Sequence, residues 1–212
     1  MAKLIVALAM SLDGFIAGSN DGADLPLGAG GMRLLQWYFN GDTPSRTYAA
    51  AAARGVRVPP FKLSSTSAQV FDALLENTGA AITGRRTYDI AGGWGGNGLV
   101  PGLPLFVLTH HAPTDVPKGE SQYTFVTDGL ESAVAQAKAA AGDKDVRLTG
   151  ASVPQQCLRA GLLDEIQIHL VPVLLASGVR LFEHLGAERI DLETISVVDS
   201  PGVTHLRYGV VK

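Results

Sequence analysis

The sequence has little cysteine: Cys157 is the only one in 212 residues. One cysteine excludes an internal disulfide framework and is typical of chains in a reducing compartment, so we predict a cytoplasmic location. No histidine lies near Cys157 in the sequence, and we interpret it as a small hydrophobic residue of a helix instead of a reactive thiol. Because paired cysteines are also missing, we predict no zinc or other metal site.

Long hydrophobic runs and clustered charge are missing as well. Leu170–Ala176 is interrupted by Pro172 and is far shorter than the roughly 20 residues that cross a bilayer. The apolar start at Leu4–Ala9 is followed by Asp13 and Gly14 without a cleavage signal, and therefore predicts a first strand instead of a signal peptide. The net charge is −3 and the basic residues are scattered, which argues against a nucleic acid or membrane partner.

What is present is a hydrophobic content of 46%, enough for a sizeable core, and we expect one domain over residues 1–212. Apolar runs alternate with helical patterns, which predicts an α/β fold with a mostly parallel sheet and helices on both faces. The expected strands are Leu4–Ala9, Ala80–Thr83, Leu105–Thr109, Tyr123–Val126, Val146–Thr149 and Glu165–Val173, and the expected helices are Ser67–Glu76, Leu130–Ala141 and Pro154–Ala160.

Two regions depart from this alternation. Leu192–Val198 and Val203–Val211 flank the turn Asp199–Gly202 and alternate in polarity, which predicts an antiparallel hairpin at one edge of the sheet. From Gly22 to Ser65 the pattern dissolves into glycine, proline and polar residues. This long loop insertion exceeds a plain connection, so we expect it to be functional or partly helical.

Three glycine-bearing turns follow predicted strands, at residues 12–18, 83–88 and 149–153. Ligands of open α/β sheets bind at the carboxyl ends of strands, so these turns can converge on one groove. The turn at Gly150 is poor in side chains and suits a phosphate group, although an ordinary strand-to-helix turn is the alternative. Arg85 and Arg86 suit phosphates, including the 2′-phosphate of NADP, or are solvated surface residues. The Gly-x-Gly-x-x-Gly fingerprint of Rossmann folds is missing after the first strand.

In combination these segments resemble the dihydrofolate reductase-like superfamily, and most closely its riboflavin biosynthesis reductase (RibD C-terminal domain-like) branch. The resemblance covers nearly the whole chain except about residues 22–65. It is carried, in order, by Ser11–Ala17, Gly84–Tyr88, Leu105–Thr109, Gly161–Glu165, Pro172–Leu175 and Gly178–Phe182.

The resemblance implies a three-layer fold with NADPH bound across the strand ends. By this similarity the cofactor residues are Ala9, Ile16 and Ala17 at the nicotinamide; Gly84, Arg85, Arg86 and Thr87 at the adenosine phosphates; Thr109 and His110 at the 2′-phosphate; and Gly150, Ala151, Ser152 and Val153 at the pyrophosphate. Ala151 stands where relatives commonly have glycine, which keeps the N–H donor but narrows the allowed backbone angles.

The substrate side departs from the family pattern. Dihydrofolate reductases carry a carboxylate on the helix before the Gly-Arg turn, and Ala68 stands at that position here. Asp72 lies one helical turn on, where it faces the groove or lies on a solvated helix surface. Asp13 is the candidate catalytic residue near the nicotinamide, or else serves its Asp-Gly turn. Trp37 is a candidate lid over the substrate or a hydrophobic anchor for its loop, and Trp94, between glycines, is a further substrate candidate.

We therefore expect an NADPH-dependent oxidoreductase that reduces a small heterocyclic or carbonyl/imine compound, with a ribosylamino pyrimidine as one candidate. The alternative is a non-catalytic NADPH-binding or sensor protein, motivated by the missing carboxylate. A third reading is a structural α/β protein whose turns bind nothing. The apolar segment Leu170–Leu175 and the terminal hairpin suggest a homodimer, as the resemblance also does.

Overall fold

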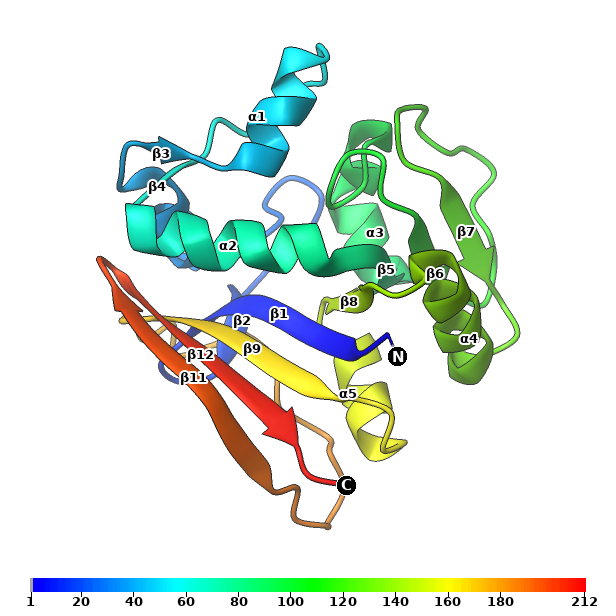
Figure 1. Cartoon of the computed structure of the whole chain (residues 1–212). Coiled ribbons are helices and arrows are strands. Elements are labelled where there is room, and N and C mark those ends of the chain that lie inside the picture. Colours follow the sequence, from blue (N-terminus) through cyan, green and yellow to red (C-terminus); the bar gives the residue numbers. More distant parts are fainter. Residues whose placement is uncertain (1) are drawn as a thin grey trace.

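The computed structural model describes residues 2–212 and is built around one eight-stranded sheet (Figure 1). In spatial order the strands are β11 (Leu192–Ser200), β12 (Val203–Val210), β9 (Glu165–Val171), β1 (Leu4–Ser11), β8 (Asp145–Thr149), β5 (Thr78–Gly84), β6 (Leu105–Leu108) and β7 (Tyr123–Val126).

Every pairing from β9 across to β7 is parallel, whereas β12 runs antiparallel to β9 and β11 antiparallel to β12. The register places Val6 of β1 beside Leu148 of β8 on one side and Ile166 of β9 on the other. The mostly parallel sheet and the C-terminal antiparallel hairpin that the sequence predicts are both confirmed.

Helices cover both faces of the sheet. On one face α4 (Leu130–Ala141) and α5 (Ser152–Arg159) pack against Leu4, Val6 and Leu148 in an apolar core. On the other face lie α2 (Ser65–Asn77), the short α3 (Arg85–Ile90) and the 3₁₀ segment η2 (Gly92–Gly96). Figure 1 shows α2 running along the upper side of β1 and β9.

Local sequence explains where α2 begins and how it is buried. The Ser64 side chain accepts a hydrogen bond from the Ser67 backbone N–H (3.1 Å), as an N-cap residue does. Ala68, Phe71 and Leu75 follow at helical spacing and are buried against the sheet side of the molecule. The predicted helix is therefore present, two residues longer at its start.

Residues 22–65 contain more regular structure than a loop insertion implies. They hold η1 (Gly31–Phe39), β3 (Thr43–Pro44), α1 (Arg46–Ala53) and β4 (Lys62–Leu63). Within this segment β3 pairs with β4. Outside it, β2 (Phe15–Gly18) pairs with β10 (Gly178–Arg180) in a second small sheet.

Among residues 2–212, no helix has the length and apolar character needed to cross a bilayer.

Candidate functional site

A cavity of about 600 Å³ opens where β5, β6 and β8 end, and we call it the β5–β6 cavity. Its wall brings together segments that are far apart in the sequence, namely the Gly84 turn, the loop after β6 and the start of α5. The lining residues are Gly84, Arg85, Asp89, Leu108, Thr109, His110, His111, Thr127, Gly129, Leu130, Ser152, Val153 and Gln156.

The turns after β5 and β8 approach each other closely enough to require glycine. A Cβ on Gly150, whose φ is +77°, would lie 2.4 Å from the Thr87 Oγ1 atom. A Cβ on Gly84 would lie 3.0 Å from the Ser152 Oγ atom. Ala151 has an ordinary φ of −96°, so its side chain strains nothing. The two predicted turns therefore converge, with each glycine lying against a side-chain hydroxyl from the other turn.

The two neighbouring arginines differ in their surroundings. Arg85 is half-buried at the cavity, where its Nε donates to Asp89 (2.8 Å) and its Nη1 donates to the His111 carbonyl (2.5 Å). Arg86 is exposed and forms an ion pair with Asp21 in the loop after β2, a contact that raises the Arg86 pKa. Arg85 thus faces the cavity, and Arg86 joins that loop to α3.

The remaining predicted cofactor residues fall in two places. Thr109 and His110 line the β5–β6 cavity, and the Thr109 hydroxyl donates to the His111 carbonyl (2.9 Å). Ala9 lies near the end of β1, beside His169 of β9. Ile16 and Ala17 lie on β2, with Ala17 paired to Val179 of β10. The nicotinamide role of these last three stays a prediction.

Asp13 lies in the turn between β1 and β2, and its carboxylate holds two turns together. It accepts hydrogen bonds from the Ser11 hydroxyl (2.6 Å) and from the backbone N–H groups of Leu175 (3.1 Å) and Ala176 (2.7 Å). These donors, led by Ser11, lower the Asp13 pKa to about 2. Such a carboxyl group is ionised at neutral pH, so the contacts favour the turn-serving role over proton donation.

Asp72 is neither in a groove nor on a solvated helix surface, and both expectations for it were wrong. Its side chain is buried and accepts hydrogen bonds from the Ser45 hydroxyl (2.6 Å) and the Arg46 backbone N–H (3.1 Å). These contacts fix the first turn of α1 onto α2, where a carboxylate also complements the helix dipole. Ala68 is buried too, so α2 offers a substrate no carboxylate at either position.

The two tryptophans have different environments. Trp37 is 1% exposed and packs between Tyr38 and His169. It is the hydrophobic anchor of η1, and the lid interpretation was wrong. Trp94 is half-buried, lies in a left-handed conformation (φ 50°) that bulky residues rarely adopt, and lines a second cavity.

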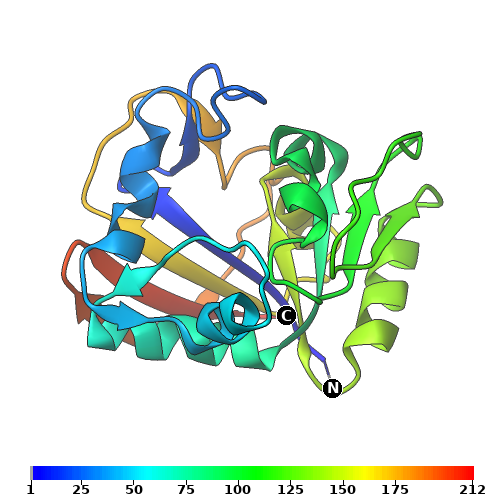
Figure 2. The ribbon, with the colours of Figure 1, turned by 90° about the horizontal axis from the view of Figure 1, so that it is seen from above.

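This second cavity, which we call the aromatic cavity, has a volume of about 360 Å³. It lies between η1, α1 and α2 on one side and the η2 region on the other; Figure 2 shows the first group in blue and cyan and η2 in green. The lining residues are Leu35, Tyr38, Tyr48, Arg57, Val58, Pro59, Phe61, Phe71, Trp94, Asn97, Gly98, Leu99, Pro101 and Arg147.

Sequence reasoning missed most of these residues. Tyr38, Tyr48 and Phe61 lie in the segment whose pattern dissolves, so nothing placed them near α2. Arg147 did leave a signal, because it is a cation in the middle of the apolar strand Val146–Thr149. A charged residue inside a buried strand requires compensation, and that requirement could have marked it.

Solved structures with this fold include reductases. Dihydrofolate reductase from Enterococcus faecalis complexed with NADP(H) has a TM-score of 0.57 at 15% identity, over 99% of this chain and 97% of that one. A putative riboflavin biosynthesis protein from Shewanella sp. PV-4 has a TM-score of 0.67 at 24% identity, with both chains covered in full. The fold is therefore dihydrofolate reductase-like, as the resemblance predicts.

The family assignment is narrower than the fold. The RibD C-terminal domain model matches residues 2–206, and the chain belongs to that family. RibD from Acinetobacter baumannii matches with a TM-score of 0.60 at 15% identity, and this chain covers 59% of its length. No curated protein matches the sequence.

Proposed function

We propose that this chain is an NADPH-dependent reductase that transfers a hydride to a small heterocyclic or carbonyl/imine substrate. The observation that carries the proposal is the β5–β6 cavity, where predicted cofactor residues from three separate segments meet. They are Gly84, Arg85, Thr109, His110, Ser152 and Val153. Membership of a family named for a riboflavin-biosynthesis domain and the reductases among the structural neighbours support the same chemistry.

The residues of this cavity fit a dinucleotide phosphate. The Gly84 and Gly150 turns carry no side chain where they approach Ser152 and Thr87, so their backbone N–H groups are available to an anion. Arg85 brings a guanidinium group to the rim, and its ion pair with Asp89 offsets part of the charge. A 2′-phosphate would compete with Asp89 for Arg85, which gives this pair a role in the choice between NADPH and NADH.

Bound NADPH would supply the hydride, and the protein's part is to position the reactants and exclude water. The turns after β5 and β8 hold the phosphates, while β1 and β2 present Ala9, Ile16 and Ala17 to the other end of the cofactor. The Asp13 carboxylate keeps the β1–β2 turn in place through Leu175 and Ala176. Orientation of this kind contributes to the rate of hydride transfer even when α2 has no acidic residue near the substrate.

The test is a titration with NADPH and NADH that follows nucleotide fluorescence. We expect submillimolar binding of NADPH and a loss of about tenfold in Arg85→Ala, because a charge-assisted hydrogen bond to phosphate is removed. Asp89→Asn should bind NADPH at least as tightly as the wild type. Arg159→Ala, which changes an exposed arginine of α5, is the control. Absence of binding by either nucleotide would end the proposal.

The alternative, an NADPH-binding protein without turnover, is favoured by one specific observation. The carboxylates of Asp13 and Asp72 are both held by structural hydrogen bonds. A riboflavin-pathway-like substrate remains our proposal because the Thermotoga maritima neighbour is described as a 5-amino-6-(5-phosphoribosylamino)uracil reductase; this chain covers 57% of its length. The two functions are separated by a single-turnover experiment in which ribosylamino pyrimidines are added to the protein with bound NADPH. Oxidation of NADPH supports the reductase, and its absence supports the binding protein without turnover.

We further propose that the protein is a cytoplasmic homodimer that associates along β11. This strand forms one of the two edges of the sheet, and Leu192, Ile195 and Val197 are 45–59% exposed on it. An exposed apolar edge strand is normally covered, and pairing with a second copy satisfies its free backbone groups. The reduced, buried Cys157 supports the cytoplasmic location.

A further inference from the structure

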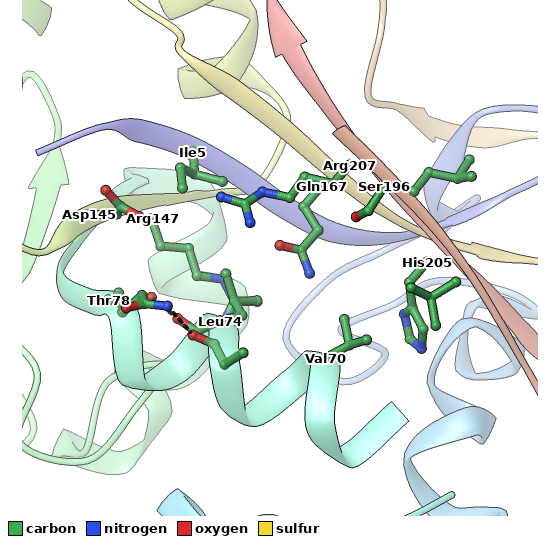
Figure 3. Close-up of a pocket in the computed structure, with 14 residues that line it drawn as sticks. Ile5, Val70, Leu74, Thr78, Asp145, Arg147, Gln167, Ser196, His205 and Arg207 are labelled. Atoms are coloured by element: carbon green, nitrogen blue, oxygen red, sulfur yellow. Dashed lines mark hydrogen bonds between the residues drawn. The ribbon is translucent and has the colours of Figure 1, made fainter. Parts of the chain in front are cut away.

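Arg147 holds a positive charge inside the protein with nothing to neutralise it. It extends from β8 toward α2, and 6% of its surface is exposed (Figure 3). Among residues 2–212 its guanidinium makes one hydrogen bond, from Nη2 to the Ala7 carbonyl (3.0 Å), and its Nε has no partner. An arginine stays charged at any physiological pH, and burial of an unpaired charge is costly.

The charged groups around Arg147 do not supply the missing anion. No Asp or Glu of the described chain forms an ion pair with it. Burial lowers the pKa of Arg147, and the neighbouring groups that oppose this shift are Tyr38 and Tyr48. Burial raises the pKa values of both tyrosines, so their hydroxyls remain neutral at physiological pH. The compensation that a buried cation requires is therefore left to a molecule from outside the chain.

Arg147 lines two cavities. The smaller one, of about 200 Å³ between the sheet and α2, has Asp145 in its wall, so a bound anion is favoured in the other. Arg147 lines the aromatic cavity, together with Tyr38 and Tyr48, and this cavity contains no acidic side chain in its wall. Arg57 adds a second, exposed cation to the wall. The strand that carries Arg147 continues two residues further to the Gly150 turn, and Ala7 lies two residues before Ala9. The cavity thus adjoins the strands whose ends make up the proposed cofactor site.

The other walls favour a flat molecule. Trp94 is held in a strained left-handed conformation between glycines, a cost that a fold retains where the side chain has a task. Tyr48 spans the cavity from α1, where its hydroxyl donates to the Leu99 carbonyl (2.7 Å). Phe61 and Phe71 complete an aromatic enclosure of a volume typical of small-molecule sites.

We infer that the aromatic cavity takes a planar aromatic or heterocyclic compound with an acidic group attached to its ring, and that this group binds the Arg147 guanidinium. The inference rests on the proposed function in one respect, that this ligand is the substrate of the reductase. Its chemistry, a flat ring and a negative charge, follows from the cavity itself.

The test compares ring carboxylates with their uncharged carboxamides, which have nearly the same shape. Benzoate and indole-3-carboxylate are titrated against benzamide and indole-3-carboxamide by calorimetry. We expect each carboxylate to bind about tenfold tighter than its carboxamide, because both accept a hydrogen bond from the guanidinium but only the carboxylate also forms an ion pair with it. Equal binding within both pairs, or binding of none of the four probes, overturns the inference.

Substitutions test whether the preference for carboxylates depends on Arg147. Arg147→Met replaces the guanidinium group by a shorter, unbranched apolar side chain and should abolish the preference for carboxylates. It should not lower the melting temperature of the free protein, because an uncompensated charge is removed. Arg159→Met should behave as the wild type. Persistence of the full preference in Arg147→Met contradicts the inference; the wild-type comparison stands alone if that variant does not fold.

Two further titrations complete the test. One distinguishes a ring carboxylate from a sugar phosphate as the source of the anion, and the other distinguishes this inference from the proposed function. Tight binding of ribose 5-phosphate without binding of benzoate would place the anion on a sugar phosphate and overturn the inference. NADPH binding that depends on Arg85, without any carboxylate preference, leaves the proposed function intact and removes this inference. Carboxylate preference without nucleotide binding keeps this inference about the cavity and removes the proposed reductase function.

Discussion

The two faces of the central sheet are built on different principles, and adjacent residues of β8 show the contrast. Leu148 faces α4 and α5 in a large core of apolar side chains. Arg147 faces α2, in a layer that also holds Gln167, His169 and His205. On this polar face even a small cavity of about 200 Å³ lies between the sheet and α2 (Figure 3). Both faces have apolar cores, but the α2 face also buries polar and charged groups at a cost in stability.

The largest effect should come from the apolar face. Leu148→Ala removes a fully buried side chain from a filled core, so we expect the free energy of unfolding to fall by about 3 kcal/mol. Denaturant unfolding measures this change. The adjacent substitution Arg147→Met should cause no loss, and a comparable loss there would mean that the polar face is also optimised for stability.

The histidine pair of the polar face predicts a dependence on pH. His169 Nδ1 and His205 Nδ1 lie 2.7 Å apart, and His205 Nε2 lies 3.0 Å from the Ser67 hydroxyl. Burial lowers the pKa of His205 to about 4. Burial, with His205 and Arg147 nearby, lowers the pKa of His169 well below its usual value. His169 is fully buried in the sheet interior.

Because both folded-state pKa values are depressed, the unfolded chain binds more protons than the folded one below pH 6.5. Stability should therefore be fully present above pH 6.5 and fall as the pH drops toward 4, by about 3 kcal/mol from His205 alone. Urea unfolding at several pH values tests this. The Asp13 carboxyl, with its pKa of about 2, loses its contribution only below its unfolded value of 3.8. His205→Asn should flatten the profile above pH 4.

An intermediate effect is expected at the edge of the polar face. Asp72→Ala leaves the buried Ser45 hydroxyl and the start of α1 without their acceptor, so the free energy of unfolding should fall by about 2 kcal/mol. Thermal and denaturant unfolding measure it, and Asp115→Ala on a loop surface serves as control. A loss of substrate binding at unchanged stability would instead restore the groove role of Asp72.

A smaller effect on stability, but a large one on cofactor binding, is expected at the end of β8. Gly150→Ala places a Cβ against Thr87 at a positive φ, and we expect NADPH affinity to fall more than tenfold with a stability loss of about 1 kcal/mol. Ala151→Gly should change neither quantity appreciably, because Ala151 already has an ordinary φ. Equal effects of the two substitutions would contradict the proposal that the Gly150 turn binds the cofactor phosphates.

The contrast between the faces also explains what the sequence could predict. The strands of the sheet were predictable because their apolar runs are local signals, and the glycine turns because backbone geometry alone requires them. The environment of Asp72 was predicted wrongly because its partner, Ser45, lies 27 residues away in the sequence. Ser45 precedes α1, a helix whose sequence has no clear periodicity. The role of Arg147 depends on which groups surround it in space, and strand pattern does not report that.

The smallest effect on stability should come from outside both faces, at the β11 edge of the sheet. Val197 of β11 is 59% exposed, so Val197→Glu should change the free energy of unfolding by less than about 0.5 kcal/mol. If a second copy covers this strand, the same substitution buries a charge in the interface and shifts the protein to monomers. Light scattering across a concentration series measures the mass. Thr204→Glu, on the neighbouring strand β12, is the matched control, and a mass equally insensitive to both substitutions would place any dimer contact elsewhere.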